Sequence, residues 1–157
     1  MIAYVFNLML MLAWGAITGL FSLGNLAVGF VLGYLIIAFT LTGEERFAKY
    51  VRKVPRFGLF MGYFFKALVM SNLRVAYDVL TPTHLMKPAV IRMPLEARTP
   101  GEITVLANLI SLTPGTLSLD VDEDANILYV HVMYLDGEDV TLAELKDMER
   151  RVLELLR

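Results

Sequence analysis

The chain has 157 residues, of which 57% are hydrophobic, and it contains no cysteine. The missing cysteines exclude disulfides, iron–sulfur ligation and thiol catalysis. The formal net charge of −2 hides a strong asymmetry, since residues 1–43 contain no Asp, Glu, Lys, Arg or His. Residues 44–87 carry eight Lys or Arg against three Asp or Glu (net +5), and residues 88–157 carry six against thirteen (net −7). Because nucleic-acid binding requires clustered cations, the acidic C-terminal region argues against a nucleic-acid partner.

The uncharged stretch 1–43 is long enough for two membrane-spanning helices. A helix needs about 20 apolar residues to cross a hydrocarbon core of about 30 Å. The one cluster of turn-forming residues, at 22–25, predicts spans over roughly residues 3–21 and 25–41. A cleaved signal peptide is not favoured, because the stretch has no basic start and exceeds the roughly 7–15 apolar residues of such a segment. We therefore expect a two-span helical hairpin.

Each predicted span contains a GxxxG motif, formed by Gly15 and Gly19 in the first and by Gly29 and Gly33 in the second. In lipid, small residues allow the close backbone approach that drives helix association. Since glycine is also common in membrane helices, the alternative is that the motifs have no contact role. Neither span holds an ionisable group, so the sequence predicts no proton relay or ion ligand in the hairpin.

The segment 44–87 is expected to form a basic cytoplasmic loop followed by an interfacial helix. The loop from Glu44 to Arg56 holds five Lys or Arg, which places it and the N-terminus in the cytoplasm. Phe57 to Leu80 has an apolar stripe at helical spacing, which predicts an amphipathic helix lying in the membrane interface. The alternative is a third, shallow span, which would put the C-terminal domain outside the cell.

Three charged residues of the interfacial helix have expected roles. Lys66 lies nearly opposite the apolar stripe, so its ammonium should reach the headgroups while its stem stays in the apolar zone. The alternative for Lys66 is a contact with a relay of coupling ions. Arg74 and Asp78 are four residues apart and should form a local ion pair.

Residues 88–157 are predicted to form a small cytoplasmic α+β domain of β-α-β-β-α order, a truncated ferredoxin-like pattern with two helices on one face of a three-stranded sheet. Both helices have a capping-box sequence, starting at Thr99 and at Thr141. Leu117, Leu119 and Val121 alternate with polar residues and are expected to share one face. The predicted strands are Ala89–Glu96, Thr116–Val121 and Ile127–Leu135.

The sequence predicts no catalytic, cofactor or metal site. It contains no HExxH, no Walker-type glycine loop and no GxSxG elbow. Asp120, Asp122 and Asp124 have the opening rhythm of a calcium loop, but Ala125 stands where glycine is needed and His131 where the bidentate Glu should be. A solvated hairpin turn is the better interpretation. The other histidine, His84, stands alone in a linker.

Three stretches of sequence resemble the E subunit of the Mrp-type (Mnh/Pha) multisubunit sodium/proton antiporters. They are SNLRVAYDVL at 71–80, LANLISLTPGT at 106–116 and LYVH at 128–131. The resemblance covers nearly the whole chain. It implies a multi-pass protein of the bacterial cytoplasmic (inner) membrane, whose partners are the other antiporter subunits, including large ones related to respiratory complex I, and the lipid bilayer.

The resemblance also implies an accessory role, because ion translocation in this family is attributed to the large subunits. We expect an assembly and stability subunit that is not an enzyme and has no cofactor. The alternative is a membrane-tethered, ferredoxin-like ligand-sensing module. Beside the four motif glycines, the candidate assembly or structural residues are Lys66, Asn72, Arg74, Asp78, Thr113, Pro114, Gly115 and Thr116.

Overall fold

A computed structural model describes residues 2–41, 43–82 and 86–157 of the chain. The linker histidine His84 lies outside the described residues. The chain divides into two compact units, Met1–Gly58 and Leu59–Arg157, and each is taken by itself below. The element order is α1 (Ile2–Thr18), α2 (Leu23–Thr40), α3 (Glu45–Leu80), β1 (Ala89–Pro94), α4 (Pro100–Leu112), β2 (Thr116–Asp122), β3 (Ile127–Val132) and α5 (Glu138–Leu156).

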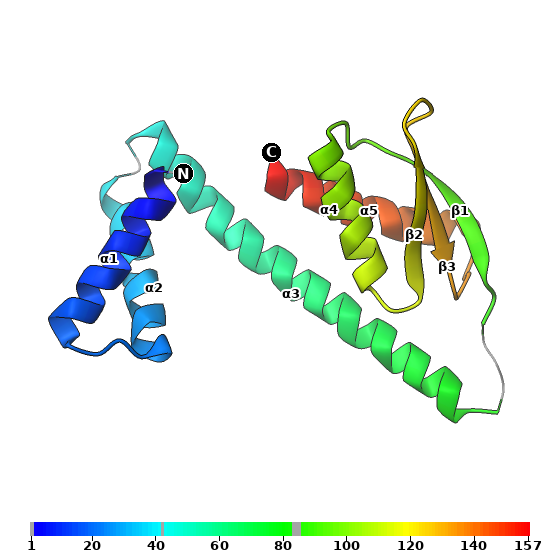
Figure 1. Ribbon diagram of the computed structural model, residues 1–157, viewed down its shortest axis with the longest axis horizontal. Coiled ribbons are helices and arrows are strands. Elements are labelled where there is room, and N and C mark those ends of the chain that lie inside the picture. Colours follow the sequence, from blue (N-terminus) through cyan, green and yellow to red (C-terminus); the bar gives the residue numbers. More distant parts are fainter. Residues whose placement is uncertain (1, 42, 83–85) are drawn as a thin grey trace. The chain divides into compact units, whose positions relative to one another are not determined.

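The first unit is built on a hairpin of the two apolar helices α1 and α2 (Figure 1). Gly19 ends α1 in the left-handed region at φ +67°, where glycine meets no steric penalty. Ser22 caps α2, since its hydroxyl oxygen accepts from the Asn25 amide at 3.3 Å. Among the described helices, α2 alone is both long and apolar enough to cross a membrane, with a mean hydropathy of 2.0, while α1 is apolar but has 17 residues.

The helix α3 is longer than the sequence predicts. It begins at Glu45, so most of the expected loop from Glu44 to Arg56 is helical. Good helix formers and an ion pair between Glu45 and Lys49, with Nζ and Oε1 2.8 Å apart, support this first part. Pro55 lies inside the helix, where it removes one backbone hydrogen bond without ending the helix.

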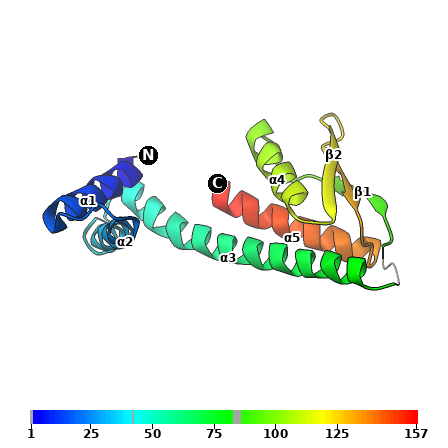
Figure 2. The ribbon, with the colours of Figure 1, turned by 60° about the horizontal axis from the view of Figure 1, so that its bottom comes forward.

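The second unit contains the predicted β-α-β-β-α arrangement. The sheet is antiparallel with strand order β1-β3-β2. The helices α4 and α5 lie on the same side of it (Figure 1). The second half of α3 overlaps α5 in the view of Figure 2 but runs at an angle to it in Figure 1. The turn between β2 and β3 is closed by Asp122, whose Oδ1 accepts from the Ala125 amide at 2.9 Å.

A β-bulge in β2 overturns the predicted alternation. The register with β3 shifts between Ser118 and Asp120, so one extra residue enters β2. Ser118 therefore pairs with the core residue Val130, while Leu117 and Leu119 are 48% and 51% exposed. The prediction that Leu117, Leu119 and Val121 share a face is wrong, because only Val121 packs against the core.

The two predicted capping boxes have different outcomes. Thr99 forms its box with Glu102 in both directions, as the sequence predicts. The box at Thr141 does not exist, because α5 begins one turn earlier, at Glu138. The acidic residues Glu138 and Asp139 suit the positive end of the helix dipole and explain the earlier start. The Thr141 hydroxyl instead donates to the Gly137 carbonyl oxygen at 2.9 Å.

The core of the second unit lies between the sheet and its two helices, and α3 contributes to it. Phe60 of α3 is buried there. The carboxylate of Glu149 on α5 is also buried, and its Oε1 accepts from the amides of Glu96 and Ala97 at 2.6 and 3.0 Å. Lys146 pairs with the other oxygen at 2.8 Å, which balances the buried charge. The other buried core residues are Ile91, Met93, Leu95, Leu106, Ile110, Leu128, Val130, Val132, Leu145, Met148 and Val152.

Candidate functional site

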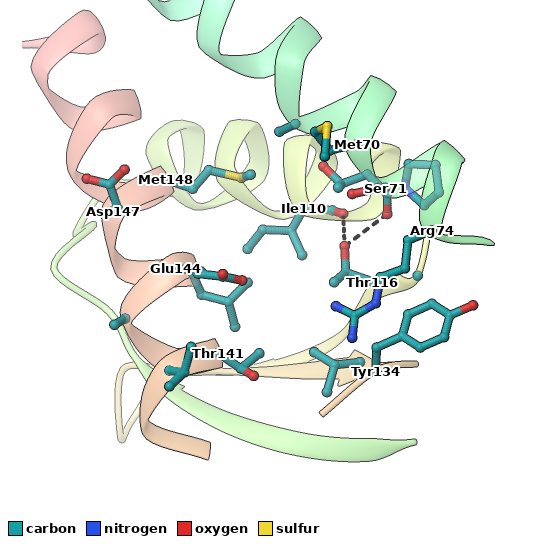
Figure 3. Close-up of a pocket in the computed structure, with 18 of the residues that line it drawn as sticks. Met70, Ser71, Arg74, Ile110, Thr116, Tyr134, Thr141, Glu144, Asp147 and Met148 are labelled. Atoms are coloured by element: carbon teal, nitrogen blue, oxygen red, sulfur yellow. Dashed lines mark hydrogen bonds between the residues drawn. The ribbon is translucent and has the colours of Figure 1, made fainter. Parts of the chain in front are cut away.

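A cavity of about 1120 Å³ lies in the second unit (Figure 3). Its walls come from α3, the turn between α4 and β2, the end of β3 and the first half of α5. Apolar side chains such as Met70, Ile110 and Met148 lie beside hydroxyls such as those of Ser71 and Thr141. The cavity thus brings together two of the three segments that carry the family resemblance, 71–80 and 106–116.

The turn at residues 113–116 forms one wall and ends α4. Thr113 is the C-cap, and its hydroxyl donates to the Leu109 carbonyl oxygen at 3.1 Å. Pro114 has no amide to continue the helix, and Gly115 adopts φ +89°, which disfavours any side chain. The hydroxyl of Thr116 then reaches back to the Ile110 and Thr113 carbonyl oxygens at 2.6 and 2.9 Å (Figure 3). Every residue of this turn has a structural task.

Arg74 forms the second wall and connects α3 to the loop before α5. Its two terminal nitrogens each lie 2.7 Å from a carboxylate oxygen of Asp136. The sequence predicted a local pair with Asp78 instead. The guanidinium also stacks over the Tyr134 ring at 4.6 Å, and the Tyr134 hydroxyl donates to Asp78 at 3.3 Å. These interactions hold the C-terminal half of α3 against the domain.

The third wall is the polar side of α5. Glu144 and Asp147 line the cavity there (Figure 3). Arg151 stacks over the Tyr63 ring of α3 at 4.2 Å and bonds Asp147 at 2.7 Å. Arg151 and Tyr63 therefore connect α5 to α3 beside the cavity, which stays open between the two helices.

Charge pairing around the cavity stabilises the ionised forms of Arg74, Asp136 and Asp147. Hydrogen bonds from Arg74 lower the pKa of Asp136, and the same pairing raises the pKa of Arg74. Hydrogen bonds from Arg150 and Arg151 lower the pKa of Asp147. Such pairs are typical of structural ion pairing rather than of acid–base catalysis, which needs a pKa near the working pH.

The arrangement fits binding better than reaction chemistry. No group of three or more His, Cys, Asp or Glu within the described ranges is placed to hold a metal ion. The hydroxyls of the turn are committed to backbone carbonyls, so they are not activated nucleophiles. The cavity is therefore an open, partly apolar site with charged side chains at its edges.

The motif glycines of the first unit differ in their surroundings. A Cβ on Gly29 would lie 2.9 Å from Trp14 Cδ1, and one on Gly33 would overlap Asn7 Oδ1, so both are at close helix contacts. A Cβ on Gly15 would lie 3.1 Å from the Phe21 ring. Gly19 has open space around it and serves the helix end instead.

Asn7 is a buried polar group that the sequence analysis did not place among the site candidates. Its side chain is fully buried and its Nδ2 donates to the Tyr50 hydroxyl of α3 at 2.7 Å. Its Oδ1 has no hydrogen-bond partner among the described residues. The signal was present in the sequence, since Asn7 is one of few polar residues in an apolar helix.

Asn25 joins α1 to α2 at the turn of the hairpin. Its Oδ1 accepts from Trp14 Nε1 at 3.1 Å, and its Nδ2 donates to the Thr18 hydroxyl at 2.6 Å and to the Leu20 carbonyl oxygen at 2.7 Å. Sequence reasoning predicted a turn here but missed this network, because nothing in the spacing reveals which side chains meet.

Two predicted site residues lie away from these clusters. Lys66 is exposed on α3 and does not line the cavity. Asn72 is also exposed, and its side-chain amide donates to the Leu68 carbonyl oxygen of its own helix at 2.8 Å.

Comparisons with known proteins identify the family. The family model MNHE, described as Na+/H+ ion antiporter subunit, matches residues 7–155. The E subunit of the Na(+)/H(+) antiporter of Alkalihalophilus pseudofirmus is 31% identical over 152 residues, with 96% of each chain covered. That of Bacillus subtilis is 31% identical over 135 residues, covering 83% of this chain and 85% of the relative.

Two solved structures contain a similar chain. One, from the Mrp complex of Dietzia sp. DQ12-45-1b, is 33% identical with a TM-score of 0.51, covering 65% of this chain and 96% of that one. The other, from an archaeal membrane-bound sulfane sulfur reductase, has a TM-score of 0.53 and covers 95% of this chain and 98% of that one; at 24% identity it shows the fold alone. The chain therefore belongs to the MNHE family of Na+/H+ antiporter subunits, which are components of a transporter rather than enzymes.

Proposed function

We propose that the chain is the accessory E-type subunit of a bacterial multisubunit Na+/H+ antiporter, needed for assembly and stability rather than for carrying the ion path. The observation that carries this proposal is the composition of the hairpin. Residues 1–43 contain no Asp, Glu, Lys, Arg or His, and a membrane proton or cation relay is built from such groups. The side-chain amide nitrogens of Asn7 and Asn25 donate hydrogen bonds that connect helices, to the hydroxyls of Tyr50 and Thr18.

The proposed membrane arrangement has α1 and α2 as two spans and the C-terminal domain in the cytoplasm. The five cations between residues 44 and 56 support this orientation. The helix α3 is long enough to span a membrane but is much less apolar than α1 and α2, which supports an interfacial position for residues 57–80 over a third span. In this proposal residues 1–43 anchor the chain, 44–87 lie along the membrane surface and 88–157 form the cytoplasmic domain.

The proposed partners are the other subunits of the antiporter, including the large ones related to respiratory complex I, and the surrounding bilayer. Relatives that span almost the whole chain are named as antiporter subunits, and a structure neighbour belongs to an Mrp complex. The exposed leucines of β2 and the groove of about 1120 Å³ are surfaces on which such partners could pack.

The test is deletion of the gene that encodes this chain. We expect sodium/proton antiport in membrane vesicles to be lost together with the assembled complex, as seen in a pull-down through another subunit. Lys66→Ala, which changes an exposed side chain, should leave both intact. Loss of antiport by Lys66→Ala in a fully assembled complex would show that this chain takes part in the ion path.

The second candidate function is a membrane-tethered ligand-sensing module, and the cavity of about 1120 Å³ favours it, since its size suits a small molecule. The full chain in mild detergent should be titrated with cations and nucleotides. The full chain is required because Phe60 of α3 belongs to the core of the domain. Saturable binding that Arg74→Ala abolishes would support sensing over assembly.

A further inference from the structure

A second hollow lies at the end of the hairpin where α1 begins and α3 starts. It has a volume of about 480 Å³ and is confined to the first unit. Three cations of α3 line it at helical spacing: Arg46, Lys49 and Lys53. A concave surface with three cations attracts an anion more strongly than the same charges scattered on a convex surface.

The α1 side of this hollow has a different character. Ile2 and Tyr4 line it, and the apolar surface continues along α1 to Val5 and Met9, which are 51% and 63% exposed. The first turn of α1 also presents amide groups at the positive end of a helix dipole. One side of the hollow therefore suits a negative head, and the surface leading from it suits an acyl chain.

We propose that this hollow binds the phosphodiester headgroup of an anionic phospholipid, with its acyl chains lying along α1. This inference rests on the proposed membrane position of the hairpin, which places the hollow at the cytoplasmic leaflet where anionic headgroups lie. Tyr4 fits the same depth, because an aromatic ring with a polar tip favours the membrane–water boundary.

The charge balance of the hollow is favourable although one acid lies nearby. Glu45 pairs with Lys49 at 2.8 Å, and both side chains remain well exposed. Arg46 and Lys53 are the other two cations, so the lining keeps a net positive charge. An acidic peptide would also meet these cations, but it would leave the adjacent apolar strip of α1 uncovered.

Native mass spectrometry of the full chain in mild detergent tests the proposal. After delipidation, phosphatidylglycerol and phosphatidylcholine are titrated separately, with inorganic phosphate as competitor. The test variant Arg46→Gln/Lys53→Gln removes two lining cations. The matched control Arg52→Gln/Arg56→Gln removes two exposed cations of the same helix that do not line the hollow.

The wild-type chain and the control should bind phosphatidylglycerol at least about tenfold more tightly than phosphatidylcholine. The affinity of the test variant for phosphatidylglycerol should fall by about tenfold or more, since each cation near an anionic headgroup contributes about fivefold to the affinity. Equal losses in the two variants, equal binding of both lipids, or displacement by millimolar phosphate would overturn the proposal. A pull-down of the other subunits through the wild-type chain is independent of these outcomes, so its failure would count against the assembly role and leave the lipid site standing.

Discussion

Arg74 and Asp136 form a two-point ion pair, with both nitrogen–oxygen distances at 2.7 Å, between α3 and the loop that precedes α5. Its geometry is the fork that guanidinium and carboxylate favour. Arg74 lines the cavity, and the pair fixes α3 to the domain. It is a tertiary contact between residues far apart in sequence, and three of the predictions below concern contacts of this kind.

Breaking this pair should loosen α3 from the domain. Arg74→Glu or Asp136→Lys alone should destabilise the contact by about 1 kcal/mol or less, because both side chains are partly exposed and screened by solvent. The exchanged pair Arg74→Glu/Asp136→Lys should recover part of the loss. Hydrogen exchange of the α3 amides around residues 70–78 in the full chain measures the effect. An unchanged exchange rate in both single variants would show that the pair does not hold α3.

The ion pair between Glu102 and Arg157 should make the domain sensitive to acid. Arg157 Nε bonds Glu102 Oε1 at 2.9 Å, and chiefly this bond lowers the pKa of Glu102 from 4.5 to about 2. A carboxylate with a lowered pKa stabilises the fold above its unfolded pKa and loses that contribution as pH falls through the folded one. The excess stability of the wild type over Glu102→Gln should therefore be full above about pH 5 and fade toward pH 2.

Thermal unfolding of the full chain in detergent, followed by circular dichroism from pH 2 to 7, measures this difference. Glu123→Gln, which removes a carboxylate from the exposed β2–β3 turn, is the control and should change the midpoint far less. A constant gap between the wild type and Glu102→Gln across the whole range would contradict the assignment.

The contact between Gly33 and Asn7 should be sensitive to a single methyl group. A Cβ on Gly33 would overlap Asn7 Oδ1, so Gly33→Ala should destabilise the hairpin by about 1–3 kcal/mol, the usual range for overpacking. Gly24→Ala is the matched control, because nothing lies within 4 Å of a Cβ there. The double variant Asn7→Ala/Gly33→Ala should be less unstable than the two single losses added together.

Trp14 is the one tryptophan of the chain and lies at the contact with Gly29, so its fluorescence reports on the hairpin. Unfolding in increasing concentrations of a denaturing detergent, followed by this fluorescence, gives the free energy of unfolding of each variant. Additive losses in the double variant would mean that Asn7 and Gly33 do not touch.

The hydroxyl of Thr116 should stabilise the end of α4. Thr116→Val keeps the side-chain shape but removes the bonds to the Ile110 and Thr113 carbonyl oxygens, which should cost about 1 kcal/mol. Thr116→Ser keeps the hydroxyl and should lose less. The thermal midpoint of the full chain distinguishes the two. Equal stability of Thr116→Val and the wild type would contradict this role.

Local signals in the sequence predicted the parts of the fold that are determined locally. The Thr99 box, the stop at Pro114 and Gly115 and the β2–β3 turn depend on neighbouring residues, and each is present as expected. The family resemblance rested on three segments, and the structure places two of them, residues 71–80 and 106–116, around one cavity. Their proximity could not be read from the sequence, because it depends on the path of α3.

The features that the sequence failed to predict share one physical cause, which is competition between a local sequence pattern and tertiary contacts. Arg74 had a plausible partner four residues away, yet its terminal nitrogens bind Asp136. The alternation in β2 was regular, yet the bulge turned Ser118 toward α4, where its hydroxyl donates to the Ala107 carbonyl oxygen at 3.0 Å. The buried Glu149 had no sequence signal, since its partners are backbone amides near residue 96.

The burial of Phe60 in the same core as Val152 has a consequence for the order of events during synthesis. The core of the domain needs one residue that precedes the first strand and others from the last helix, so it cannot be completed until nearly the whole chain has left the ribosome. The apolar hairpin is made first and, if it enters the bilayer as proposed, is already inserted by then. The domain would thus fold beside the membrane surface, on a chain already anchored in the compartment where its partners are found.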